Sequence, residues 1–174
     1  MAGDPIIKAK EAMKKFVGEM NEEFTKIGVL AFSDKTKMVV KPTNEYAQVI
    51  KGIDKIAVGE VGYGNAAEPF TDASNELQIG RFGKKKESIR YLIVLTDGVW
   101  SNSRHAVKQA QNCHKEGIEV IALGFGGADY KFLKEIASTD EFASITNLTE
   151  LAGSFSKIAQ VIGDSTPGSS IKMY

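Results

Sequence analysis

Cysteine is scarce in this sequence, and Cys113 is the only one among 174 residues. A single cysteine cannot form a disulfide within the chain or build a zinc site from several thiolates. An excess of charge is also lacking, because 22 Lys and Arg residues balance 22 Asp and Glu residues. Neither nucleic acid nor an anionic membrane surface is therefore expected as a partner.

Long apolar runs are missing as well. No stretch approaches the roughly 20 apolar residues that a membrane-spanning helix needs. The first residues, MAGDPIIKAKEAMKKF, carry a charge every few positions and lack the apolar centre of a signal peptide. Together with the single cysteine, this pattern leads us to expect a cytoplasmic protein with no membrane contact.

The sequence does contain a regular alternation of apolar patterns. Apolar residues three and four positions apart predict helices, and short apolar runs between them predict strands. Asp4 and Pro5 are typical of a helix start, since Asp can cap free amides and Pro fits the first turn. Helices are predicted at residues 4–23, 45–56, 66–77, 103–116, 130–138 and 148–162, and strands at 27–33, 36–40, 89–96, 118–125 and 142–145.

This alternation indicates an α/β fold, namely a doubly wound, mostly parallel sheet with helices on both faces. The length is that of one domain, which we place at residues 1–163, followed by a flexible tail or linker at 164–174. Ligands of such sheets bind beyond the carboxyl ends of the strands. Loops at residues 33–34, 62–65 and 96–102 are predicted to gather there, whereas residues 80–87 form a basic loop.

Asp97 ends the most apolar strand, in the stretch YLIVLTDGVW. One interpretation is turn chemistry, because Asp followed by Gly is common in turns. The other is a metal site, because the strand end faces the ligand crevice and the hydroxyls of Thr96 and Ser101 are near in sequence. Oxygen groups of this kind suit a hard cation such as magnesium or calcium. These residues alone leave both interpretations open.

Other motifs give less support to chemistry. The loop Gly124–Asp129 follows a strand and precedes a helix, as a dinucleotide-binding loop would, but Asp129 stands where the third glycine or alanine is required. His105 and Cys113 lie eight positions apart on one predicted helix, about 12 Å along its axis, which is too far for one metal or a nucleophile–base pair. Neither motif supports catalysis on its residues alone.

Three stretches, taken in order, resemble the von Willebrand factor type A domain: YLIVLTDGVWSN, GIEVIALGFGGADYKFLKEIAS and ITNLTELAGSFSKIAQVI. The family is a doubly wound sheet that usually carries a metal-ion-dependent adhesion site. Its ligands come from a D-x-S-x-S motif, a Thr in a second loop and an Asp in a T-D-G-like third loop. The resemblance implies that Asp97 is the third-loop ligand and that Asn65 takes the second-loop position. It also implies a protein partner that completes the coordination through an acidic residue.

The resemblance has one large departure. Met1 begins just after the place where the D-x-S-x-S motif should end, so the first, central strand and its motif are absent from this chain. Such a loss leaves a gap of about 9.6 Å, or two strand spacings, between the strands at 27–33 and 89–96. We expect a segment of another chain or the C-terminal tail to fill it in part, or subunits to exchange strands into a homo-oligomer.

These features predict a non-enzymatic interaction module whose cation site is incomplete. Asp97 and Asn65 are the expected metal ligands, with Thr96 and Ser101 as outer-shell groups. Two ligands hold Mg²⁺, Ca²⁺ or Mn²⁺ weakly, because hard cations take six or more oxygens, so we expect little or no metal in this chain. The alternative is a nucleotide-binding or enzymatic α/β domain that uses the Gly124–Asp129 loop.

Overall fold

The computed structural model describes residues 3–79 and 89–165. The predicted basic loop at 80–87 and most of the predicted tail lie outside these residues. The chain divides into two compact units, one made of Met1–Val29, Met38–Glu60 and Asn147–Tyr174, and a second made of Leu30–Lys37 and Val61–Thr146. A single domain over residues 1–163 stays a prediction. No helix in the described part of the chain is both long and apolar enough to cross a membrane.

The first unit contains helices α1 (Asp4–Glu19), α2 (Tyr46–Lys55) and α6 (Leu151–Ser165). Helix α1 begins with the predicted Asp–Pro pair, but it ends at Glu19 rather than near residue 23. The side chain of Asn21 accepts a hydrogen bond from the backbone N–H of Glu23 at 2.9 Å, which stabilises a turn instead of another helical turn.

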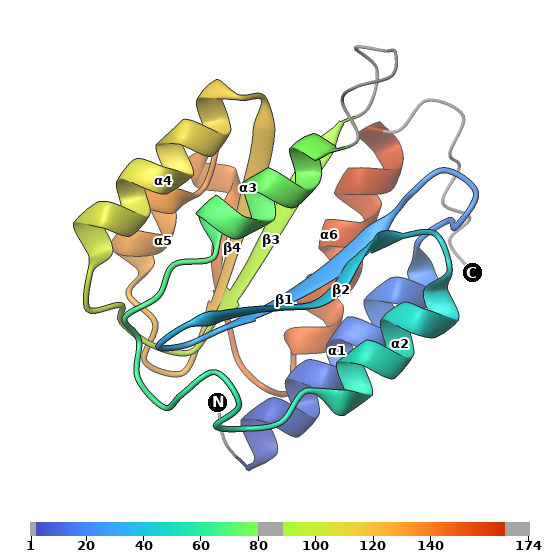
Figure 1. Cartoon of the computed structure of the whole chain (residues 1–174), viewed down its shortest axis with the longest axis horizontal. Helices are drawn as coiled ribbons and strands as arrows, with labels where there is room; N and C mark the ends of the chain where they lie inside the picture. The colour runs from blue at the N-terminus through green and yellow to red at the C-terminus, as the bar shows by residue number, and fades with distance from the viewer. Residues whose placement is uncertain (1–2, 80–88, 166–174) are drawn as a thin grey trace. The chain divides into compact units, whose positions relative to one another are not determined.

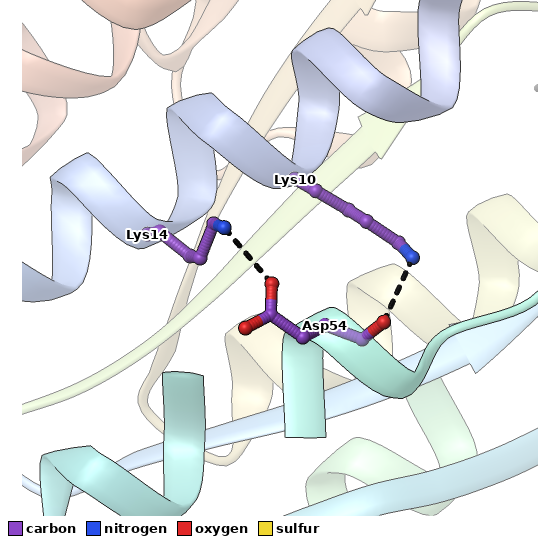
Figure 2. Close-up of polar contacts among 3 residues, drawn as sticks. All are labelled: Lys10, Lys14 and Asp54. Atoms are coloured by element: carbon purple, nitrogen blue, oxygen red, sulfur yellow. Dashed lines mark hydrogen bonds and ion pairs between the residues drawn. The ribbon is translucent and has the colours of Figure 1, made fainter. Parts of the chain in front are cut away.

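Helix α1 packs against α6 and contacts α2. The rings of Phe16 and Phe155 meet edge to face at 5.7 Å, and the hydroxyl of Ser156 donates to Glu19 at 2.7 Å. Figure 2 shows Asp54 of α2 joined to α1 by the ammonium group of Lys14 at 2.9 Å and by that of Lys10 at 3.1 Å. These charged groups are exposed, so the ion pair adds at most about 1 kcal/mol, and the apolar contacts dominate.

Helix α6 also differs from its predicted bounds of 148–162. Asn147 accepts a hydrogen bond from the N–H of Glu150 at 2.9 Å, and this turn delays the helix until Leu151. At the other end the helix continues to Ser165, so Asp164 and Ser165, which we assigned to the tail, are helical.

The strands form two hydrogen-bonded sheets. Strands β1 (Ile27–Phe32) and β2 (Thr36–Thr43) form a two-stranded sheet, which confirms the predicted hairpin. Strands β3 (Arg90–Thr96), β4 (Ile118–Phe125) and β5 (Ala143–Thr146) form a parallel sheet in the order β3-β4-β5. Its register places Thr96 beside Gly124, and Gly124 beside Ile145.

The second unit is built around the parallel sheet. Helices α4 (Ser103–Lys115) and α5 (Tyr130–Ile136) pack against each other and against β4, as Figure 1 shows. Helix α3 (Phe70–Ile79) contacts α4, and a short 3-10 helix, Asp140–Phe142, precedes β5. The core contains fully buried residues from the strands and all three helices, among them Phe70, Val120, Ala122, Leu133 and Ile136.

Helix α3 begins at Phe70, four residues later than predicted. The carboxylate of Glu68 accepts from the backbone N–H groups of Phe70 and Thr71 at 2.6 and 3.1 Å, which caps the helix there. The predicted fold class, a mixed α/β fold with a parallel sheet, is confirmed. Among the described residues β3 pairs only with β4, and what lies along its other edge stays a prediction.

Candidate functional site

Three loops of the second unit meet through hydrogen bonds, as the sequence predicts. The first loop follows β1, the second precedes α3 and the third follows β3. The backbone N–H of Asp34 donates to the carbonyl of Val61 at 3.0 Å, and the hydroxyl of Ser33 donates to the carbonyl of Gly64 at 2.6 Å. The first and second loops are therefore tied together by main-chain and side-chain bonds.

Asp34 organises the second loop. Its Oδ2 atom accepts from the backbone N–H of Tyr63 at 3.2 Å and from that of Gly64 at 3.0 Å. Two glycines allow this approach, because a Cβ at Gly64 would lie 1.9 Å from Asp34 Oδ1, and Gly62 has a φ of 101°. Sequence reasoning did not single out Asp34. The signal for it was the pair of glycines two residues apart, which indicates that another group comes close.

Asn65 joins the second loop to the third. Its side-chain Nδ2 donates to the carbonyl of Val99 at 2.6 Å, while its own carbonyl accepts from the N–H and the hydroxyl of Ser101 at 3.2 and 3.1 Å. The two predicted metal ligands, Asn65 and Asp97, thus stand on loops that bond directly to each other. The side-chain oxygen of Asn65 is the atom that a hard cation would take, because the amide nitrogen donates to Val99.

Thr96 has a structural role that the sequence did not suggest. Its Oγ1 accepts from the indole Nε1 of Trp100 at 3.0 Å and from the backbone N–H of Gly98 at 3.4 Å. Both Thr96 and Trp100 are buried. The indole ring packs against three phenylalanines at centroid distances between 5.0 and 5.9 Å, namely Phe32, Phe70 and Phe132. Thr96 therefore folds the third loop onto the core, and its outer-shell role stays a prediction.

The Gly124–Asp129 loop supports the third loop from the β4 side. The N–H of Gly127 donates to the carbonyl of Asp97 at 3.2 Å, and Gly126 adopts a φ of 62°. A Cβ at Gly124 would lie 2.6 Å from a methyl group of Leu133, so this glycine allows close packing of α5. Asp129 caps α5 by accepting from the N–H of Lys131 at 3.0 Å, which places a carboxylate where a phosphate would bind.

The polar groups at the loops suit a hard cation only in part. Asp97 supplies a half-buried carboxylate and Asn65 an amide oxygen. The Asp34 carboxylate accepts two backbone amides. Within residues 3–79 and 89–165 no group of three or more His, Cys, Asp or Glu side chains is placed to hold a metal ion. The described ligand set is smaller than the six or more oxygens that such cations take.

Helix α4 carries Cys113 and the two histidines, His105 and His114, and each has a different environment. Burial, followed by the charge of Glu116, raises the pKa of the Cys113 thiol to about 11, so the thiolate needed for nucleophilic attack is scarce near neutral pH. His105 is exposed, while His114 bonds through Nε2 to the carbonyl of Ile136 at 3.0 Å. No paired nucleophile and base results from these three residues.

Comparisons with known proteins agree with this architecture. A sequence model of the von Willebrand factor type A domain matches residues 1–159. The collagen alpha-5(VI) chain of Homo sapiens is 30% identical over 148 residues, which cover 77% of this chain and 5% of the collagen chain. Whole-protein properties of that relative therefore do not transfer directly.

Solved structures give the same fold. Proximal thread matrix protein 1 from the mussel byssus, with a zinc-occupied MIDAS motif, has a TM-score of 0.72 and 22% identity over 92% of this chain and 42% of its own. The manganese-loaded TRAP protein of Plasmodium vivax has a TM-score of 0.68 and 16% identity over 87% of this chain and 65% of its own. At these identities the likeness establishes the fold. With the family match over residues 1–159, the chain belongs to the von Willebrand factor type A domain family.

Proposed function

We propose that this domain binds a protein partner through a divalent cation held between the second and third loops. The observation that carries the proposal is the set of bonds from Asn65 to Val99 and Ser101, which keeps Asn65 against the loop of Asp97. The position beyond the carboxyl end of β3 is where parallel sheets bind ligands. The zinc and manganese named in two structures of the same fold support a divalent cation.

In this proposal Asp97 and Asn65 hold the cation, and Thr96 and Ser101 orient the groups around it. Two protein oxygens bind Mg²⁺, Ca²⁺ or Mn²⁺ weakly, so the cation is largely lost from the isolated chain. A carboxylate from the partner adds ligands and charge, and it raises cation affinity. By linkage, the cation raises partner affinity by the same factor.

The domain acts without catalysis in this proposal. The similar proteins named above are a collagen chain and a thread matrix protein. The glycines of the Gly124–Asp129 loop have packing and turn roles that do not require a nucleotide. A thermal shift caused by nucleotides but not by magnesium would favour the enzymatic alternative. The cytoplasmic location stays a prediction.

Cation binding can be tested by titrating Mn²⁺ into the protein in a calorimeter. We expect a dissociation constant of about 1 mM or weaker, and its loss in Asp97→Asn, which keeps the side-chain shape but removes the charge. Asp140→Asn, at an exposed carboxylate in the 3-10 helix, is the matched control and should bind as the parent does. Equal binding by Asp97→Asn and the parent would contradict the assignment, and micromolar affinity would contradict the incomplete ligand set.

A further inference from the structure

Most of the exposed apolar side chains of the second unit lie at the carboxyl ends of the strands of the parallel sheet. Among its described residues, the large apolar side chains that are exposed are Tyr63, Ile89, Val99, Tyr130 and Ile145. Ile89 precedes β3, but the other four lie in the loops beyond the sheet's carboxyl edge or at the end of β5. The ring of Tyr130 has a local partner, because the ammonium group of Lys134 lies 5.0 Å from its centre.

Tyr63 and Val99 are the most exposed of these residues, at 85% and 56%. Their backbones are nevertheless fixed. The N–H of Tyr63 donates to Asp34 at 3.2 Å, and the carbonyl of Val99 accepts from Asn65 at 2.6 Å. Two apolar side chains are thus exposed to solvent on a main chain that hydrogen bonds hold in place. Because the main chain is already held, a partner that covers these residues has only their side chains to order, which lowers the entropic cost of binding.

The two side chains fit within one interface that includes the cation site. Tyr63 is two residues from Asn65, which spans at most about 7 Å, and the Asn65 side chain then reaches Val99. The backbones of Tyr63 and Val99 are therefore within about 15 Å of each other. A standard interface covers about 800 Å² on each partner, or roughly 30 Å across.

We propose that Tyr63 and Val99 flank the cation site as apolar contacts, and that the partner is a protein segment whose acidic residue stands beside a large apolar side chain. This inference rests on the proposed function, which supplies the role of the acidic residue. Burial of a Tyr at the centre of an interface often provides much of its binding energy, and burial of a Val adds to it by removing apolar surface from water. An anionic lipid surface fits less well, because the carboxylates of Asp34 and Asp97 lie in the same loops.

The test begins by selecting phage-displayed random peptides on the intact protein in millimolar Mn²⁺ and eluting them with EDTA. We expect recovered peptides to share an Asp or Glu with a large apolar residue close to it. Binding of a recovered peptide is then compared in Tyr63→Ser, Val99→Ser and the control Ile89→Ser, whose parent side chain is 48% exposed at the other end of β3. Tyr63→Ser and Val99→Ser should each weaken binding about tenfold, and Ile89→Ser should not.

The outcomes separate this inference from the function on which it rests. Peptides that require Mn²⁺ and Asp97 but bind Tyr63→Ser and Val99→Ser at the parent affinity would overturn the apolar contacts and leave the cation-dependent function standing. Failure to recover any peptide that EDTA releases would overturn both. Mn²⁺ titration of the two serine variants should match the parent, because neither side chain is a proposed ligand of the cation.

Discussion

Replacing Gly64 with alanine should destabilise the second loop by displacing the carboxylate of Asp34. A Cβ at this position would lie 1.9 Å from Asp34 Oδ1 and 2.8 Å from its Cγ, so the side chain must move. Movement breaks the hydrogen bonds to the N–H groups of Tyr63 and Gly64. Both bonds are exposed, so we expect their combined loss to lower the free energy of unfolding by about 1–2 kcal/mol.

The cause can be isolated with a double-mutant cycle. Asp34→Ala removes the same two bonds and should cost a similar amount, but it also removes the atoms that Gly64→Ala would meet. The double variant should therefore lose about as much unfolding free energy as Asp34→Ala alone, which gives a coupling energy of about 1–2 kcal/mol.

Urea unfolding at constant salt, read from the transition midpoint, measures the stability of the parent, the two single variants and the double variant. Gly153→Ala is the control, since nothing lies within 4 Å of a Cβ there and the residue is inside α6. It should stabilise the protein by about 0.5–1 kcal/mol. If the losses of unfolding free energy in the two single variants simply add in the double variant, the claim that Gly64 accommodates Asp34 is refuted.

Three further predictions follow from the buried groups and the sheet edge. Thr96→Val leaves the indole N–H of Trp100 buried without its acceptor, so the free energy of unfolding should fall by about 1–3 kcal/mol. Urea unfolding followed by the emission of the single tryptophan measures this loss, and an unchanged midpoint would contradict the role of Thr96. Burial raises the pKa of Cys113 from 9.0 to about 11, so the folded state holds this proton more tightly. The stability that the raised pKa contributes is fully present below pH 9 and should be lost as the pH rises towards 11. This decrease of the unfolding free energy with pH should disappear in Cys113→Ala. Among the described residues β3 pairs only with β4, so we expect light scattering to detect strand-exchanged oligomers, and a monomer with a cooperative melt would argue against them.

Apolar periodicity was sufficient to predict the order and type of the α-helices and strands, but not the short 3-10 helix at Asp140–Phe142. The parallel pairing of β3 with β4 agrees with two strands that are largely apolar on both faces. Strand β5, with the sequence ASIT, is short and partly exposed and carries a weaker signal of this kind. The helix ends were less predictable, because single polar side chains fix them. Asn21 turns the chain after α1, Glu68 delays α3 and Asn147 delays α6. Each competes locally with helix formation, and periodicity carries no information about that competition.

The sequence predicted which loops meet but not the individual bonds between them, and the cation site itself stays a prediction. The rule that ligands bind beyond the carboxyl ends of strands identified the loops that hold Asn65 and Asp97. It could not show that Asp34 accepts from two backbone amides, because that contact joins residues 30 positions apart. Nor could it show that the hydroxyl of Thr96 accepts from Trp100, since nearness to Asp97 in sequence suggested only a role at the cation.

The bonds that order these loops do not require a cation. Asp34 fixes the second loop, Asn65 ties it to the third, and Gly127 donates to the carbonyl of Asp97. Because the protein supplies all of these bonds, the loops have their shape before a cation or a partner arrives, and binding incurs a smaller ordering cost. The weak cation affinity that we propose for the isolated chain is then a consequence of few ligands rather than of mobile loops. It follows that Asp34→Ala should weaken partner binding by loosening the loops, even though Asp34 need not touch the partner.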